Sequence, residues 1–100
     1  MQVPFLVEIR LPEVFTPDFA ALIPAQRAFV SRQLKDKRLL SYSLAMDRSR
    51  LWAVVIARDS DEVELLLEQM PLYSYYNQFK IHPLAFSEHL ARAVPEFSLN

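Results

Sequence analysis

The sequence predicts one α+β domain with elements in the order strand, helix, strand, strand, helix, strand. Three observations support this prediction. Apolar residues alternate in short segments, which is the period of half-buried strands. Two other segments carry apolar residues at helical spacing. The length of 100 residues fits one domain. We assign it to residues 1–100, with a core over 3–83 and a C-terminal tail over 84–100.

The first strand and the first helix are the most strongly signalled. Val3–Leu11 alternates between apolar and polar positions along most of its length. Thr16 then offers a hydroxyl N-cap, and Pro17 suits the first helical position. Pro24 removes one backbone donor and clashes with the preceding turn. We therefore expect the helix to kink or restart near Ile23.

Two strands and a capped helix follow. The strands are expected at Leu39–Met46 and Leu51–Ala57, joined by a turn at Asp47–Arg50. Asp59 or Ser60 then caps a short helix. The predicted strands form a hairpin, and the helix follows directly after it.

The last segments complete a recognisable order. Tyr75–His82 is expected to be the fourth strand, and Phe86–Val94 a terminal helix in the tail. The order βαββαβ is that of the split βαβ, ferredoxin-like arrangement. Because both crossovers are right-handed, both helices cover one face of a four-stranded antiparallel sheet.

Composition excludes several kinds of site. There are 11 Lys and Arg against 12 Asp and Glu, so no charge excess indicates a nucleic-acid or anionic-membrane partner. Cysteine and glycine are both absent. This excludes disulfides, thiolate metal sites, phosphate loops and dinucleotide-binding fingerprints. We expect no metal and no cofactor. No signal peptide or membrane-spanning run is seen, so we expect a cytoplasmic protein.

The two faces of the predicted sheet differ in polarity. One is expected to carry Phe5, Val7, Ile9, Leu11, Leu40, Tyr42, Leu44, Met46, Phe79 and Ile81. The other is expected to carry Leu6, Glu8, Arg10, Ser41, Ser43, Trp52, Val54, Ile56, Gln78, Lys80 and His82. A single bulge would exchange the faces of part of a strand. Monomers rarely leave so large an apolar patch open. We therefore expect a second copy to cover it, giving a dimeric α/β barrel whose polar residues line a cavity.

Several short segments resemble the muconolactone isomerase family. The first is Leu11-Pro12 with Thr16-Pro17, and another is Met70-Pro71-Leu72-Tyr73-Ser74-Tyr75. The segments Leu22–Ala28 and Asp47–Trp52 resemble an uncharacterised bacterial branch of that family, and the likeness runs from Val7 to Leu84.

The resemblance implies a dimeric α/β barrel assembled into higher oligomers. It also implies a cofactor-free isomerase that moves a double bond within a lactone by proton transfer, in the breakdown of aromatic compounds. Two departures stand out. Family members carry Lys and Glu on the first helix where Pro24–Phe29 stands here, which puts the isomerase activity in doubt. They also have a glycine after that helix, where Asp36-Lys37-Arg38 stands here.

Two residues are candidates for proton transfer. Glu8 lies in a mostly apolar strand and could be a desolvated base. The alternative is a cross-strand ion pair with Lys80. His82 could shuttle the proton, or could be a partly exposed histidine at a strand end.

Four residues are candidates for substrate binding. Arg10 could hold a carboxylate, or could be a surface charge at a strand end. Arg27 could reach the cavity from the kinked helix, or could lie on its solvated face. Trp52 and Tyr75 could line a pocket, or fill a core or subunit contact. Arg48 and Arg50 are expected to be turn charges or subunit contacts.

Two functions from different classes remain open. The first is a cofactor-free isomerase of a small lactone or organic acid. The second is a non-catalytic homo-oligomeric barrel that binds a small hydrophobic acid or serves as an assembly module. The discriminating feature is whether Glu8, Arg10, Lys80 and His82 converge on a cavity or neutralise one another.

Overall fold

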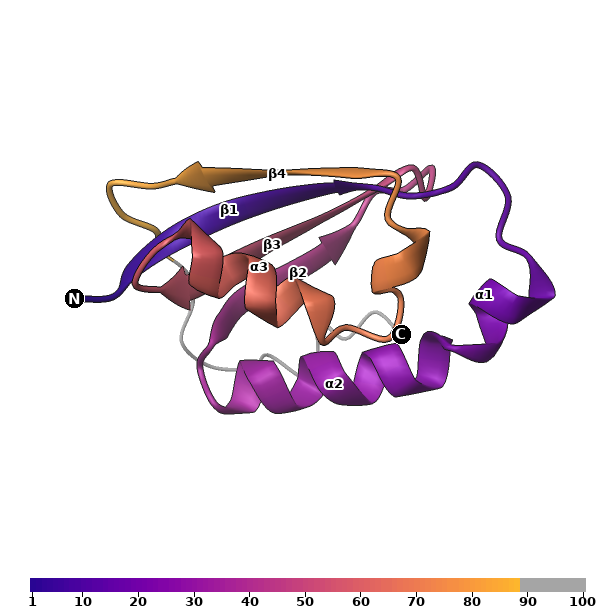
Figure 1. The fold of residues 1–100 in the computed structure, drawn as a ribbon, viewed down its shortest axis with the longest axis horizontal. Coiled ribbons are helices and arrows are strands. Elements are labelled where there is room, and N and C mark those ends of the chain that lie inside the picture. The colour runs from indigo at the N-terminus through magenta and orange to yellow at the C-terminus, as the bar shows by residue number, and fades with distance from the viewer. Residues whose placement is uncertain (89–100) are drawn as a thin grey trace.

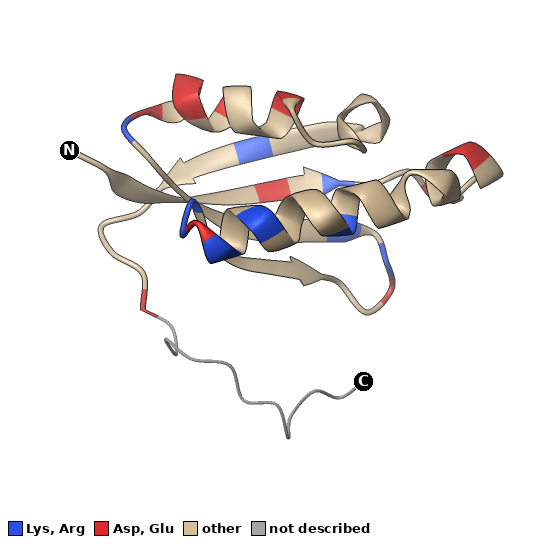
Figure 2. Ribbon diagram, turned by 90° about the horizontal axis from the view of Figure 1, so that it is seen from below, with Lys and Arg blue, Asp and Glu red and all other residues tan. Residues whose placement is uncertain are grey.

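The computed structural model describes residues 1–88 and shows a sheet covered by helices on one side (Figure 1). The four antiparallel strands lie in the order β2-β3-β1-β4. They are β1 (Val3–Arg10), β2 (Leu39–Leu44), β3 (Arg50–Ala57) and β4 (Gln78–Pro83). The helices are α1 (Pro17–Ala21), α2 (Ile23–Lys35) and α3 (Ser60–Glu68). The expected ferredoxin-like arrangement is confirmed, and α2 and α3 run across the same face of the sheet (Figure 2).

The first predicted helix is divided as its prolines require. The Thr16 hydroxyl accepts a hydrogen bond from the backbone N–H of Phe19 at 3.2 Å, and Pro17 takes the first helical position. The chain leaves the helix at Leu22 and resumes at Ile23. The restart predicted near Ile23 is confirmed, because Pro24 has no N–H to continue the first helix.

Helix α2 ends without the usual glycine. The Arg38 N–H donates to the Gln33 carbonyl at 3.0 Å, and the Lys37 N–H donates to the Leu34 carbonyl at 3.1 Å. This is the Schellman pattern, which places one residue in the left-handed region. Lys37 fills that position with a φ of 62°. The chain therefore accepts a steric cost here that glycine would avoid.

The turn of the β2–β3 hairpin begins earlier in the sequence than the alternation predicted. Strand β2 ends at Leu44 rather than Met46, because the Arg48 N–H bonds back to the Ala45 carbonyl at 2.9 Å. Arg48 adopts a φ of 62°, a second left-handed position without glycine. The turn at Asp47–Arg50 is confirmed, although Arg50 already belongs to β3.

The start of β4 and the beginning of the expected terminal helix differ from the predictions. Strand β4 begins at Gln78, and the expected start at Tyr75 is wrong because Tyr73–Tyr75 forms a 3-10 turn. That turn lies where the aromatic side chains pack on the helix side of the sheet. Of the expected terminal helix at Phe86–Val94, residues 86–88 are not helical and the rest lies outside the described residues.

The α3 cap forms as predicted. The Asp59 carboxylate accepts from the Glu62 N–H at 2.9 Å, and the Glu62 carboxylate accepts from the Arg58 N–H at 2.6 Å. Two N–H groups at the helix start are thereby satisfied.

The core lies between the sheet and the helices. Its strand residues include Phe5, Val7, Ile9, Leu51, Ala53, Val55 and Ala57, all buried. Leu39 is buried where Leu40 was expected, because a bulge between Leu39 and Ser41 shifts the register. Leu44 and Met46 were also expected on this covered face and are exposed, since they lie at and beyond the end of an edge strand.

Within residues 1–88, no helix covers the opposite, open face of the sheet (Figure 1). It carries the even-numbered residues of β1, β3 and β4, as predicted: Leu6, Glu8, Arg10, Trp52, Val54, Ile56, Gln78, Lys80 and His82. The apolar members on β1 and β3 are half-buried. The described part of the chain therefore provides no partner layer for this partly apolar sheet face.

Candidate functional site

The open face carries a cluster of charged side chains centred on Glu8, in the middle of β1. An Nη1 atom of Arg50, on β3, donates to Oε2 of Glu8 at 2.8 Å. From β4, Nε2 of His82 lies 3.9 Å from Oε1 of the same carboxylate. Glu8 is only 30% exposed, so these contacts form in a partly desolvated place. One carboxylate oxygen is held by Arg50 and the other faces His82.

Strand register explains why these residues meet. Glu8 lies opposite Trp52 on β3 and opposite Lys80 on β4. Arg50 and His82 each lie two residues along their strand from these partners, on the diagonals, where long side chains still reach. Side chains on one face of adjacent strands therefore converge on Glu8 from both sides.

The ion pair expected between Glu8 and Lys80 is not formed. The two residues are cross-strand neighbours as predicted, but the carboxylate pairs with Arg50 instead. The guanidinium offers several donors in a fixed fork and approaches along the diagonal. Among the described residues, Lys80 and Arg10 are left without an ion-pair partner.

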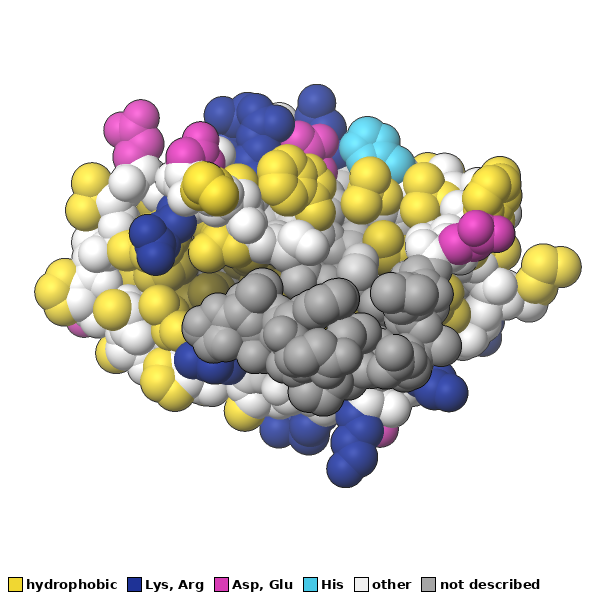
Figure 3. Space-filling model, turned by 180° about the vertical axis from the view of Figure 1, so that it is seen from behind, with side chains coloured by type: hydrophobic (Ala, Val, Ile, Leu, Met, Phe, Trp, Pro, Cys, Tyr) yellow, Lys and Arg dark blue, Asp and Glu magenta, His cyan; other side chains and the backbone are white. Residues whose placement is uncertain are grey.

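These cations line a small hollow beside the carboxylate. Its volume is about 110 Å³, and it is lined by Glu8, Arg10, Arg50, Gln78, Phe79 and Lys80. Figure 3 shows Lys and Arg side chains beside acidic and His side chains along the rim of the molecule, with apolar side chains next to them. The hollow therefore combines one paired carboxylate with two unpaired cations.

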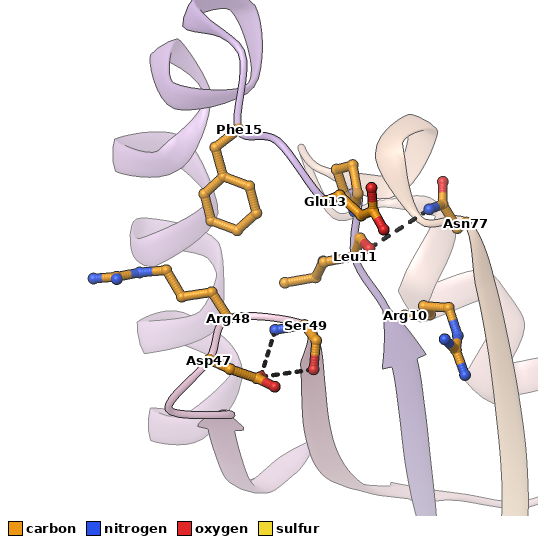
Figure 4. A pocket seen from close by; sticks show the side chains of 9 residues that line it. Arg10, Leu11, Glu13, Phe15, Asp47, Arg48, Ser49 and Asn77 are labelled. Carbon is orange, nitrogen blue, oxygen red and sulfur yellow. Dashed lines mark hydrogen bonds between the residues drawn. The ribbon is translucent and has the colours of Figure 1, made fainter.

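A larger cavity lies at the end of the sheet, between the loop after β1 and the β2–β3 turn. Its volume is about 860 Å³. Leu11 and Phe15 form its apolar part, whereas Arg10 and Arg48 lie on opposite sides and point away from each other (Figure 4). Arg10 lines both this cavity and the hollow beside Glu8.

Polar groups at the rim of this cavity are engaged with the backbone and with each other. Oδ1 of Asp47 accepts from the Ser49 N–H at 3.0 Å and from its hydroxyl at 2.7 Å (Figure 4). These hydrogen bonds hold the pKa of Asp47 below its ordinary value. The Asn77 amide reaches the Leu11 carbonyl at 3.5 Å. These hydrogen bonds shape the β2–β3 turn and tie the segment before β4 to the loop after β1.

The predicted site residues separate into two groups. Glu8, Arg10, Trp52 and His82 share the open face, with Trp52 directly opposite Glu8 on β3. Arg27 is exposed on α2, in the helix layer on the other side of the sheet. This is the solvated-face alternative for Arg27, and the sheet lies between it and Glu8.

Tyr75 also belongs to the helix side. It lies in the 3-10 turn rather than on β4, and its ring packs edge-on against Phe19 with centroids 5.3 Å apart. This is a packing role, which was the alternative to pocket lining.

Sequence reasoning missed Arg50 and Gln26. Arg50 was assigned to the turn, although the last residue of a turn is also the first of the next strand. Gln26 is 3% exposed and joins Tyr42 and Tyr76 in the core. Its signal was a polar residue at a buried position of the helical pattern.

Two further properties bear on the kind of site. Within residues 1–88, no three His, Asp or Glu side chains gather closely enough to hold a metal ion. In the same part of the chain, no helix is both long and apolar enough to cross a membrane.

No family model and no curated protein matches this chain. Among solved structures, it is similar to TftG from Burkholderia phenoliruptrix AC1100, a 5-chloro-2-hydroxyhydroquinone dehydrochlorinase solved in complex with 2,5-dihydroxybenzoquinone. The TM-score is 0.65 at 12% identity, and the match covers 79% of this chain and 90% of that chain. At this identity the similarity establishes a shared fold, and any functional conclusion has to come from the residues around Glu8.

Proposed function

We propose that this chain is a cofactor-free enzyme that moves a proton within a small anionic molecule, such as a lactone or an organic acid. The observation that carries the proposal is the cluster on the open face. A carboxylate is fixed there beside a histidine, with two cations that have no partner among the described residues.

The proposed site is completed by a second copy of the chain. Trp52, Val54 and Ile56 form an apolar strip on the open face, next to the charged cluster. Burying that strip against the same strip of another copy removes apolar surface from water at about 25 cal/mol per Å². The charged residues of both copies then lie in the space between two sheets, which gives the dimeric α/β barrel.

The proposed chemistry gives each member of the cluster a role. Glu8 removes a proton from a carbon next to a carbonyl group, and the C–H electron pair forms a C=C bond while the carbonyl oxygen takes the negative charge of an enolate. Arg10 and Lys80 hold the substrate anion and stabilise the developing negative charge. Glu8 or His82 then returns the proton to a different carbon, so that the double bond has moved and no atom is gained or lost.

Arg50 has a positioning role in this scheme. Its bond to Oε2 of Glu8 fixes the carboxylate plane and leaves Oε1 free, 3.9 Å from His82. A base held in one orientation reacts faster than one that must first be ordered.

Two likenesses support this class of reaction. The short motifs resemble those of muconolactone isomerases, whose reaction is a proton transfer within a lactone. The dehydrochlorinase with a similar fold removes hydrogen and chloride from a hydroxylated ring compound, and a proton must also leave in that step.

The second candidate is a binding protein of the same architecture. It is favoured by the Pro24–Phe29 stretch of α2, where Arg27 is the one charged residue and where the isomerases carry Lys and Glu. In this version Arg10 and Lys80 bind the anion, and the only role of Glu8 is to keep the Arg50 side chain in position on the open sheet face.

One set of variants separates the two candidates. Purified protein is assayed by absorbance against a panel of small unsaturated lactone carboxylates and hydroxylated quinones. The enzyme predicts turnover that Glu8→Gln reduces by at least about a hundredfold, the usual range for a lost general base, while Lys35→Ala on α2 keeps it. Binding without turnover in the unaltered protein supports the second candidate, and neither binding nor turnover contradicts both.

A further inference from the structure

The two long helices carry opposite charges. Helix α2 contains Arg27, Arg32 and Lys35 and no acidic residue. Helix α3 contains Asp61, Glu62, Glu64 and Glu68 and no basic residue. Figure 2 shows the basic and acidic helices on the same face of the sheet. A net charge of -1 therefore conceals a strong separation of charge.

The outward faces of these helices are opposite in sign, and each includes an exposed leucine. On α2, Arg27 and Lys35 flank the exposed Leu34, which is 39% accessible. On α3, Asp61 and Glu68 flank the exposed Leu65, which is 58% accessible. On α3 the spacings of four, three and seven residues place the set on one side of the helix. On α2, Leu34 follows Arg27 by seven residues and Lys35 follows Arg27 by eight, so this set also lies within one side. Each surface carries charges of one sign and one exposed leucine.

Among residues 1–88, the charges of these two surfaces form no ion pair. Ion pairs in the described part of the chain join Glu8 to Arg50 and His82, and Arg58 to Glu62. None joins α2 to α3 across residues 1–88. Exposed charges of one sign on one helix repel each other and are stabilised by a surface of opposite sign.

We propose that the outward face of α2 in one copy of this chain binds the outward face of α3 in another copy. The occupant is a second copy because the same chain presents both halves of a complementary pair. Such a head-to-tail contact joins two different surfaces, so repeated contacts close into a ring or continue as a chain of molecules. The contact leaves the open sheet face free and is independent of the proposed function.

A polyanion is the competing partner for α2. It is disfavoured because the acidic α3 lies on the same face of the sheet and would repel it. The test below includes this partner as an outcome.

The test is a charge-reversal pair studied by sedimentation velocity and light scattering. One variant carries Asp61→Lys with Glu68→Lys, and the other carries Arg27→Glu with Lys35→Glu. Unaltered protein is expected to exceed the mass of a dimer at about 0.05 M salt and to dissociate at about 0.5 M salt. Each variant alone is expected to stop at the dimer or monomer, because the outward faces of its two helices then carry charges of the same sign.

Mixing the variants provides the decisive arm. In the mixture every α2–α3 contact between unlike variants is again complementary, so the larger assembly is expected to return. Glu13→Lys with Glu88→Lys makes the same change in net charge at exposed positions off α3 and should leave assembly intact. The proposal is overturned if the unaltered protein never exceeds a dimer at low salt or if reversal changes nothing. It is also overturned if mixing fails to restore the assembly, or if only added oligonucleotide binds α2.

Discussion

Replacing Gln26 by methionine tests how the helix layer is held on the sheet. The Gln26 amide nitrogen donates to the Tyr42 hydroxyl at 3.0 Å and to the Tyr76 hydroxyl at 3.3 Å. Its carbonyl accepts from the backbone N–H of Leu72 at 3.1 Å, in a buried place. One side chain of α2 is thus hydrogen-bonded to Tyr42 on β2 and to Leu72 and Tyr76, which both lie between α3 and β4.

The expected cost follows from these contacts. Without the Gln26 carbonyl, the Leu72 N–H is buried with no acceptor, at a cost of about 1–3 kcal/mol. Loss of the bonds to Tyr42 and Tyr76 adds about 1 kcal/mol each, and the easier burial of a thioether offsets part of the sum. We expect the free energy of unfolding to fall by about 2–4 kcal/mol.

Urea titration at fixed protein concentration measures this change. Tyr42→Phe is the matched control, because the amide can still donate to Tyr76 and the Leu72 N–H keeps its acceptor. It should cost about 1 kcal/mol. If Gln26→Met stays within about 0.5 kcal/mol of the unaltered protein, the polar contacts do not hold the helix layer in place.

The remaining predictions concern helix ends and a buried hydroxyl. Lys37→Gly should raise the free energy of unfolding by about 0.5 kcal/mol by relieving the left-handed strain, whereas Asp36→Gly should lower it. A lower free energy of unfolding in both variants would contradict a left-handed Lys37 at the end of α2. Thr16→Ala should cost about 1 kcal/mol and Thr16→Ser much less, in the same urea titration; equal losses would exclude hydroxyl capping. Burial raises the pKa of Tyr76, so above about pH 10 only the unfolded chain loses that proton and stability falls. Urea titrations repeated at rising alkaline pH should show a smaller loss of stability in Tyr76→Phe than in the unaltered protein. An equal loss in both would mean that another group causes it.

Local signals were sufficient for most of the fold. Thr16 and Asp59 are caps whose chemistry depends only on neighbouring residues, and both form as expected. Alternation fixed the faces of β1 and β3, because those strands are regular along their length. The restart near Ile23 followed from one missing N–H.

Other features depend on contacts that no short segment contains. The bulge after Leu39 and the 3-10 turn at Tyr75 are decided by packing against the helix layer. The partner of Glu8 was misjudged for a similar reason. Opposite neighbours follow from register, but a diagonal partner such as Arg50 depends on side-chain length and approach.

The most direct test of the central claim is anion binding at the open face, followed by the fluorescence of Trp52. It is the only tryptophan and lies opposite Glu8 in the sheet. Titration with small aromatic carboxylates should change its emission to saturation in the unaltered protein. Arg10→Ala with Lys80→Ala should abolish the change, and Lys35→Ala should retain it. A change that survives loss of both cations, or no change in the unaltered protein with any anion, would contradict an anion site beside Glu8.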